Sequence, residues 1–217
     1  MNFQSVCDLP MLLRETRIYP LTDVRLSGLS HAEQVIRLSH GGANLIQLRE
    51  KNLTPREFFK QAEEALHLAR QRGVRIVIND RVDMALALEA DGVHLGHEDL
   101  PPEAARRLLG DRAIIGVSTH TVEQARQAAR LPVNYLAIGP IFATSSKSDS
   151  EPVLGLDGLR NVRNAIGDFP LVAIGGISHE NALEVLKSGA DAIAVISALL
   201  ANPSEVAERT KRLLALL

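Results

Sequence analysis

A chain of 217 residues, 46% of them hydrophobic, can bury one full core and suits a single α/β domain better than two. The formal net charge is only -2 at pH 7, and the charges are interspersed, which excludes an electrostatic footprint for nucleic acid or for a membrane surface. Because of this balanced charge, the expected partner is a small molecule. The lone cysteine, Cys7, excludes an internal disulfide and favours a reducing, cytoplasmic location.

The first residues carry no strong pattern. Residues 1–16 contain Asp8, Glu15 and one short apolar stretch, Met11 to Leu13, so they predict neither a signal peptide nor a membrane-spanning helix. We expect an N-terminal extension over residues 1–16 and one domain over residues 17–217.

Eight short apolar runs alternate with segments of helical period in the rest of the chain. They centre near Tyr19, Ile46, Val77, Val93, Ile115, Ala137, Ala173 and Ala194. This alternation predicts a parallel sheet with crossover helices, and eight units favour a single closed (β/α)8 TIM barrel. An open doubly wound sheet is the alternative, because periodicity does not distinguish a closed sheet from an open one.

Capping boxes, in which a hydroxyl residue is followed three positions later by Glu or Gln, predict the starts of several helices. They occur at Thr54 with Glu57, Ser30 with Glu33, and Thr121 with Gln124. Helices are expected to stop at Gly41, Gly73 and Gly189.

Most of the apolar runs end in polar residues, which should gather at one site because ligands of α/β folds bind at the carboxyl ends of strands. Gly175 and Gly176 follow the seventh run, and Ile196 and Ser197 end the eighth. Barrels commonly bind a phosphate there on backbone N–H groups. The alternative is that the glycines only permit a tight turn and that Ser178 caps the next helix.

Charged residues follow other runs at the same end of the sheet. Arg49, Lys51 and Lys147 are more cations than one monophosphate needs, which favours a diphosphate, although each could be a solvated loop charge. Asp80 and Asp99 follow adjacent runs, and Mg2+ is typically held by one or two carboxylates with phosphates and water. Either aspartate could instead be a helix N-cap.

Other chemistries lack their motifs. His94, His97 and His120 do not have the spacing of a compact zinc site. The chain also has no G-x-S-x-G elbow, P-loop or Rossmann glycine fingerprint, so serine hydrolase, NTPase and dinucleotide-binding functions are not indicated.

Together, seven segments resemble the thiamine phosphate synthase family, over roughly residues 19–200. They are Gln47 to Lys51 (QLREK), Asn79 to Asp83 (NDRVD), Val93 to Asp99 (VHLGHED), Gly116 to His120 (GVSTH), Gly139 to Lys147 (GPIFATSSK), Val172 to Ile177 (VAIGGI) and Val195 to Ser197 (VIS). The chain departs from the family at His97, where Gln is usual, and at residues 143–147 (ATSSK), where the family usually reads PTxTK.

The resemblance implies a transferase that joins an aminopyrimidine methyl diphosphate to a thiazole phosphate and releases diphosphate by a dissociative, Mg2+-assisted substitution. It implies that the pyrimidine diphosphate is held by Gln47, Leu48, Arg49, Glu50, Lys51, Asn79, Ser118 and Lys147. It implies that the thiazole phosphate is held by Thr144, Ser145, Ser146, Gly176, Ile196 and Ser197. It further implies catalytic roles for Arg49, Lys51, Ser118 and Lys147, and Mg2+ on Asp80 and Asp99.

Two other functions remain open. A thiazole tautomerase would have a similar barrel and phosphate pocket, with His120 as its proton-transfer group, but isomerisation needs no paired carboxylates for a metal. A non-catalytic binder of phosphate ligands would also keep the glycines and cations. The sequence permits a homo-oligomer, since any of the outer helices could pack against a second copy.

Overall fold

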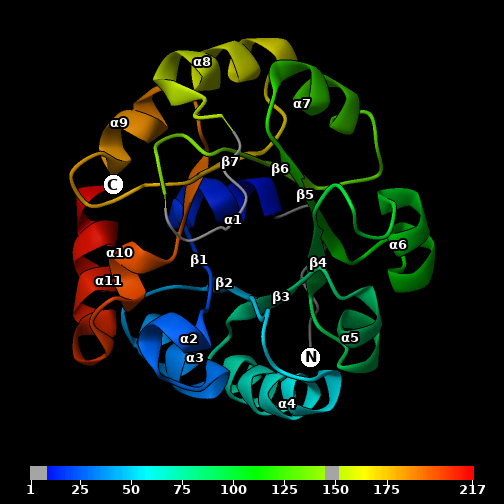
Figure 1. Cartoon of the computed structure of the whole chain (residues 1–217), viewed down its shortest axis with the longest axis vertical. Helices are drawn as coiled ribbons and strands as arrows, with labels where there is room; N and C mark the ends of the chain where they lie inside the picture. Colours follow the sequence, from blue (N-terminus) through cyan, green and yellow to red (C-terminus); the bar gives the residue numbers. More distant parts are fainter. Residues whose placement is uncertain (1–8, 145–151) are drawn as a thin grey trace.

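Eight parallel strands form the centre of this computed structural model, over the residues that the structure describes, 9–144 and 152–217. They are β1 (Ile18–Pro20), β2 (Leu45–Leu48), β3 (Arg75–Asn79), β4 (Gly92–Leu95), β5 (Ile114–Thr119), β6 (Tyr135–Ile138), β7 (Leu171–Ile174) and β8 (Ala192–Val195). Neighbours in the sheet follow the order β1-β8-β7-β6-β5-β4-β3-β2. Figure 1 shows the strands enclosed by a ring of helices.

The two ends of this order, β1 and β2, meet through a single isolated bridge. Leu21 pairs with Gln47, and the Thr22 backbone N–H donates to the Gln47 carbonyl at 2.9 Å. This seam completes the barrel. The closed (β/α)8 fold predicted from the sequence is therefore confirmed, and the open-sheet alternative is wrong.

Helices precede, connect and follow the strands. In the described residues they are α1 (Leu9–Thr16), α2 (Val24–Ser27), α3 (His31–His40), α4 (Pro55–Gln71), α5 (Val82–Ala87), α6 (Pro102–Leu109), α7 (Val122–Ala128), α8 (Gly155–Ile166), α9 (Ala182–Lys187), α10 (Ser197–Leu200) and α11 (Val206–Leu216). Helices α2 to α9 connect successive strands and cover the outer face of the barrel, whereas α1 precedes β1 and α10 and α11 follow β8. In α4, the buried residues Phe58, Ala62, Ala65 and Ala69 recur at helical spacing, which turns one apolar face toward the sheet.

Two of the three predicted capping boxes are confirmed. At Ser30 and at Thr54 the hydroxyl accepts from the N3 backbone N–H, and the N3 glutamate accepts from the cap in return. The box predicted at Thr121 is wrong in one half. Thr121 does accept from the Gln124 backbone N–H, but the Gln124 side chain accepts from His120, one residue before the cap.

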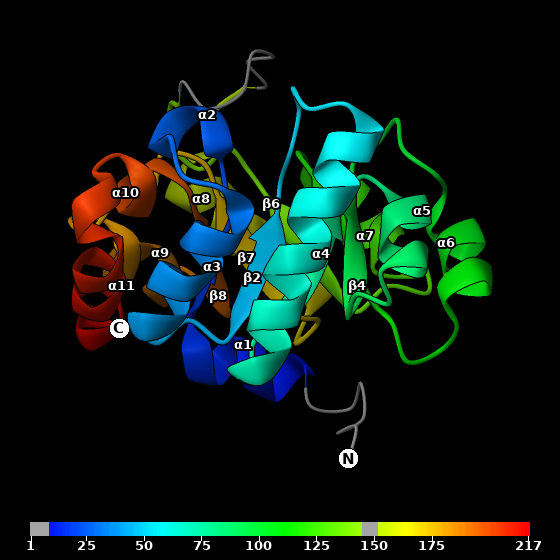
Figure 2. The same ribbon diagram turned by 90° about the horizontal axis from the view of Figure 1, so that it is seen from below.

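The apolar core has two layers. One lies between the strands and the helices, and the other fills the barrel interior with inward-facing residues such as Leu45, Val77 and Val172. Leu13 of α1 is fully buried in this inner layer, and Figure 2 shows α1 across the end of the barrel opposite α2. Arg14 Nε also donates to Asp191 Oδ1 at 2.9 Å, which ties α1 to the start of β8.

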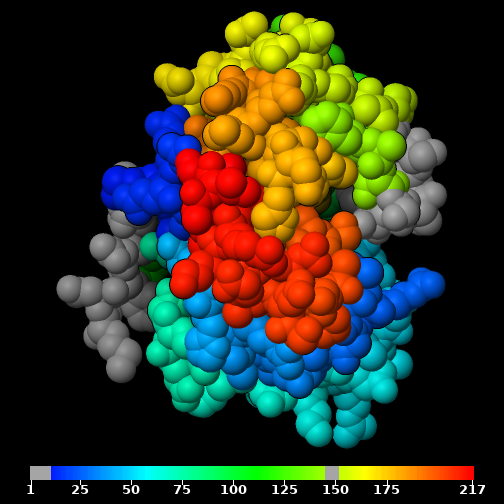
Figure 3. All heavy atoms as spheres, turned by 90° about the vertical axis from the view of Figure 1, so that its left-hand side faces the viewer, coloured from blue at the N-terminus to red at the C-terminus, as the bar shows by residue number. Residues whose placement is uncertain are grey.

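The C-terminal helix completes the outer layer. α11 packs against α3 and α10, so segments from the two ends of the chain lie side by side, as the red and blue surfaces of Figure 3 show. None of the helices in the described part of the chain is long and apolar enough to span a bilayer.

Candidate functional site

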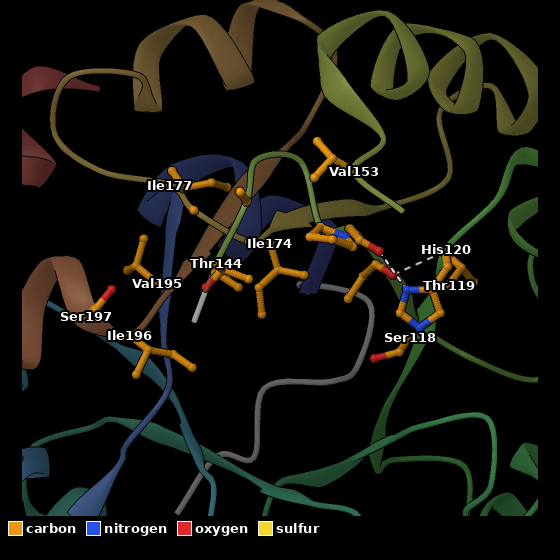
Figure 4. A pocket seen from close by; sticks show the side chains of 17 residues that line it. Ser118, Thr119, His120, Thr144, Val153, Ile174, Ile177, Val195, Ile196 and Ser197 are labelled. Atoms are coloured by element: carbon orange, nitrogen blue, oxygen red, sulfur yellow. Dashed lines mark hydrogen bonds between the residues drawn. The ribbon is translucent and has the colours of Figure 1, made fainter. Parts of the chain in front are cut away.

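A cavity opens at the carboxyl ends of β5 to β8. Its lining includes Ser118, His120, Thr144, Gly176 and Ser197, each from the end of a strand or the loop that follows it (Figure 4). Apolar side chains from β7 and β8 form its back wall (Figure 4). The cavity lies where barrel enzymes bind their ligands.

The backbone of the two glycines runs close to the loop after β6. Gly175 and Gly176 have φ values of +103° and +63°, which other residues rarely adopt. A Cβ on Gly175 would lie 2.6 Å from the Pro140 Cα, and one on Gly176 would lie 2.6 Å from the Ala143 carbonyl oxygen. Glycine is therefore required for the β6 loop and the β7 loop to form one wall of the cavity. The N-cap of α9 is Asn181, and Ser178 lies in the turn before it, where its hydroxyl accepts from the Glu180 N–H at 3.3 Å.

Arg49 and Lys51, which follow β2, are both paired with carboxylates. Arg49 Nη1 lies 3.2 Å from Asp23 Oδ2, and its side chain is only 14% exposed. Lys51 Nζ forms a salt bridge with Asp80 Oδ2 and is half exposed. Both cations are thus held at the mouth by ion pairs and are not free loop charges.

Two other residues of the QLREK segment, Leu48 and Glu50, lie on either side of Arg49 and do not face the mouth. Leu48 is fully buried in the layer between strands and helices. Glu50 Oε1 accepts from the backbone N–H groups of Lys51, Asn52 and Leu53, at 2.8, 2.6 and 3.1 Å. Burial of Glu50 acts to raise its pKa, but these amides outweigh burial and hold the pKa below its ordinary value. We therefore propose that Glu50 shapes the loop that carries Lys51.

Glu50→Gln is expected to lower the free energy of unfolding at pH 7 by about 1–2 kcal/mol, because an amide oxygen is a weaker acceptor for three N–H groups than a carboxylate is. The pKa of Glu50 is lower in the folded state, so its stabilising effect is complete above the ordinary pKa of a glutamate and is lost as the pH falls through the lower folded value. Urea unfolding at pH 7 and at pH 3 measures this. Glu63→Gln on the exposed face of α4 is the control, and equal stability losses in both variants would contradict the prediction.

The two aspartates lie together beside β3 and β4. Asp80 has φ +63°, a strained conformation for a residue with a side chain. Asp99 Oδ2 accepts from the Gly96 N–H at 2.7 Å. Burial raises the pKa of Asp99, and the charge of Asp80 and a hydrogen bond between the two carboxyls raise the pKa further. The hydrogen bond from the Gly96 amide lowers it, but by less. The N-cap alternative is wrong for both, since the caps of α5 and α6 are Arg81 and Pro101.

This pair fits a hard divalent cation. Two facing carboxylates, one with a raised pKa, leave negative charge that a cation would offset, and Mg2+ needs no more than one or two protein carboxylates. Lys51 already offsets part of that charge through Asp80. No cluster of three or more His, Cys, Asp or Glu side chains suitable for a metal occurs in residues 9–144 or 152–217.

A chain of hydrogen bonds crosses the barrel interior below the mouth. Gln47 Nε2 donates to the Tyr19 hydroxyl at 3.1 Å, and the two tyrosine hydroxyls are 2.9 Å apart. The Tyr135 hydroxyl is 2.9 Å from His94 Nδ1, and His94 Nε2 is 2.9 Å from Ser118 Oγ. Sequence reasoning missed Tyr19 and Tyr135. The available signal was that the only two tyrosines of the chain lie within apolar strand runs.

His120 lines the cavity on the other side of Ser118. Its Nδ1 lies 2.6 Å from the Gly139 carbonyl oxygen, which can only accept, so Nδ1 carries the proton in this contact. Of the other predicted residues, Asn79 ends β3. Ser145, Ser146 and Lys147 lie outside the described residues.

The candidate residues follow one another around the rim in the order of the strands. Lys51, Asp80 and Asp99 come after β2, β3 and β4, and Ser118 is on β5. Thr144, Gly176 and Ser197 follow β6, β7 and β8. One arc of the mouth thus holds cationic and carboxylate groups, the opposite arc is a small-residue pocket, and Ser118 stands between them.

Known proteins resemble this chain over its whole barrel. A family model described as thiamine monophosphate synthase matches residues 18–199. The thiamine-phosphate synthase of Chloroflexus aurantiacus is 47% identical over 186 residues, 85% of each chain, and that of Albidiferax ferrireducens is 47% identical over 205 residues, 93% of each. A solved structure of thiamine phosphate pyrophosphorylase from Pyrococcus furiosus has a TM-score of 0.85 at 39% identity, covering 94% of this chain and 96% of that one. The matched residues include all eight strands.

Proposed function

This chain belongs to the thiamine monophosphate synthase family, and from that membership we propose that it joins an aminopyrimidine methyl diphosphate to a thiazole phosphate, forming thiamine phosphate and diphosphate. One observation carries the proposal. The rim holds two adjacent sets of groups with different chemistry, one suited to a diphosphate and one to a monophosphate, with Ser118 between them. Two phosphorylated substrates can thus lie side by side.

The diphosphate side is the arc after β2 to β5. Arg49 and Lys51 are cations held near the mouth by Asp23 and Asp80, and a diphosphate can exchange places with these carboxylates at little cost in side-chain order. Asp80 and Asp99 would hold Mg2+, which supplies positive charge beside the departing diphosphate when bound. Asn79 would contact the pyrimidine, and Lys147 would add a further cation, whereas Gln47 lies buried below the mouth with its amide nitrogen on Tyr19.

The thiazole phosphate side is the arc after β6 to β8. Gly175 and Gly176 line the cavity without a side chain, so a phosphate can approach their backbone closely, and Ile196 and Ser197 line it from the end of β8. The Thr144 hydroxyl lies on the same wall, and Ser145 and Ser146 follow it in sequence. Apolar residues behind this set, such as Ile174 and Val195, suit the thiazole ring.

The reaction then needs positioning and charge stabilisation more than proton transfer. The bond between the methylene carbon and the diphosphate oxygen breaks, and both electrons leave with diphosphate, which Arg49, Lys51 and Ser118 stabilise. The thiazole nitrogen forms the new bond with its lone pair, so no base removes a proton from it. Holding the two rings face to face across Ser118 supplies the remaining advantage.

The test is product formation from the two purified substrates, with and without Mg2+. We expect thiamine phosphate and diphosphate in equal amounts, and only with the metal present. A folded protein that binds the thiazole phosphate but forms no product would overturn the synthase proposal. Isomerisation of a thiazole phosphate that is lost in His120→Asn would then favour a tautomerase, because His120 faces the cavity with Nδ1 already committed to Gly139.

A further inference from the structure

We propose that His94 is a positioning residue that fixes the Ser118 hydroxyl as a hydrogen-bond donor to the diphosphate, through a directional chain that starts at Gln47 and passes through both tyrosines. The inference deepens the proposed function and rests on it for the identity of the anion. Its physical basis lies in the barrel interior, among residues that are buried and held in place by their neighbours.

The direction of the chain is set at Gln47. Its amide nitrogen has hydrogens and no free lone pair, so it can only donate to the Tyr19 oxygen, 3.1 Å away. Tyr19 must then direct its own hydrogen to Tyr135, at 2.9 Å, because a buried hydroxyl hydrogen without an acceptor is costly. Burial raises the pKa of both tyrosines, so each phenol keeps its proton.

Tyr135 passes the same direction on to His94. Its hydroxyl donates to His94 Nδ1 at 2.9 Å, which makes Nδ1 an unprotonated acceptor. In a neutral imidazole the proton is then on Nε2, which donates to Ser118 Oγ at 2.9 Å. Ser118 therefore receives a hydrogen bond from below, and its own hydrogen is directed toward the cavity that it lines (Figure 4). That is the geometry an anionic oxygen needs.

The reversed chain is less favourable at both ends. It would require the Gln47 amide to be turned over, which places the two N–H bonds where Oε1 now lies, a buried position with no partner among the described residues. In its present orientation the amide uses one N–H on Tyr19, whereas in the reversed orientation neither N–H would have an acceptor among the described residues. At the other end, the Ser118 hydrogen would point to His94, and the serine would present lone pairs to a diphosphate.

Packing holds the two rings in register. The His94 and Tyr135 rings stack with centroids 5.5 Å apart and planes at 28°, and the two tyrosine rings meet edge to face at 5.7 Å. Gly116 on β5 makes this possible, because a Cβ there would lie 2.0 Å from the Tyr135 Cζ. The His94 ring is thus fixed by contacts as well as by hydrogen bonds, as expected of a residue that orients another.

The first test is the tautomer of His94 in the ligand-free protein, read from the ring nitrogen and proton shifts of 15N-histidine-labelled enzyme, with His94→Gln to assign the signal. The Nε2–H form is expected. A predominant Nδ1–H form would overturn the proposal, because the chain would then run the other way. This measurement needs no substrate, so it stands apart from any failure of the proposed function.

The second test is a double-mutant cycle on the binding of inorganic diphosphate, with Mg2+ present, by calorimetry. His94→Leu is expected to weaken binding about tenfold, whereas His94→Gln, which keeps an acceptor for Tyr135 and a donor for Ser118, should stay within about threefold of wild type. In a Ser118→Ala background, His94→Leu should have no further effect. His67→Gln on the outer helix α4 is the control.

Equal losses from His94→Leu with and without Ser118 would overturn the inference, because His94 would then act on general structure and not through the serine. Equal binding by the Leu and Gln variants would do the same. If the wild-type protein forms no thiamine phosphate, only the proposed function is overturned, because neither the His94 tautomer nor the binding of inorganic diphosphate depends on turnover.

Discussion

Asp99→Asn is expected to lower kcat by about 100-fold or more while leaving the protein folded. Asparagine keeps an oxygen that can accept from the Gly96 N–H, so the loop after β4 should hold its shape. The substitution removes one of the two charges that would bind Mg2+, and with it much of the stabilisation of the departing diphosphate. Initial rates across a Mg2+ titration measure both effects, since the residual activity should also need more metal.

The matched control is Glu98→Gln, which removes a charge from the exposed neighbouring residue. It should leave kcat and the Mg2+ dependence near wild type. The unfolding free energy of Asp99→Asn should not fall, because the negative charge of Asp80 already disfavours ionised Asp99 in the folded state. Near-normal turnover of Asp99→Asn at limiting Mg2+ would contradict the metal assignment.

Gly176→Ala is expected to raise the KM for the thiazole phosphate by about tenfold or more, with a smaller change in the KM for the pyrimidine substrate. The new methyl group would lie 2.6 Å from the Ala143 carbonyl oxygen, so the loops after β6 and β7 must separate. Those two loops form one wall of the cavity, so their separation changes the distance between a bound phosphate and the backbone N–H groups of that wall. Steady-state kinetics with each substrate varied in turn would show the asymmetry.

The alanine also carries a backbone cost at a positive φ, of about 1–2 kcal/mol. Gly73→Ala separates this cost from the steric effect. Gly73 has φ +67°, follows α4 at the opposite end of the barrel, and has open space around the position of a Cβ. It should lose comparable stability and keep both KM values. Equal KM changes in the two variants would mean that the Gly176 effect is not local to the cavity.

The fold was predictable because parallel strands buried on both faces are nearly continuous apolar runs, separated here by helical segments with clear starts. The residues of the rim were predictable on related grounds, since the carboxyl ends of parallel strands share one edge. Those that the sequence placed there, such as Lys51, Asp80 and Asp99, do follow the ends of the adjacent strands β2, β3 and β4.

Pairing between those residues was not predictable. Lys51 and Asp80 are 29 residues apart, and Tyr19 and Tyr135 are 116 apart, so only the closed barrel decides that they meet. Glu50 shows the other difficulty. It stands between two cations in sequence, but its carboxylate is taken up by the backbone amides of its own loop, which a residue pattern does not reveal.

The seam between β1 and β2 is the place where neighbouring strands of the barrel are held together by the fewest backbone pairs. Every other neighbouring pair of strands shares three or four registered residue pairs, whereas this one has a single bridge, at Leu21 and Gln47. Local unfolding starts where the fewest contacts must break. The Gln47–Tyr19 hydrogen bond joins β2 to β1 across this seam, and it is the first bond of the hydrogen-bond chain that ends at Ser118. A local opening of the seam would therefore disturb that hydrogen-bond chain at its Gln47 end. The Gln47–Tyr19 hydrogen bond is the first link of that chain that an opening of the seam would break.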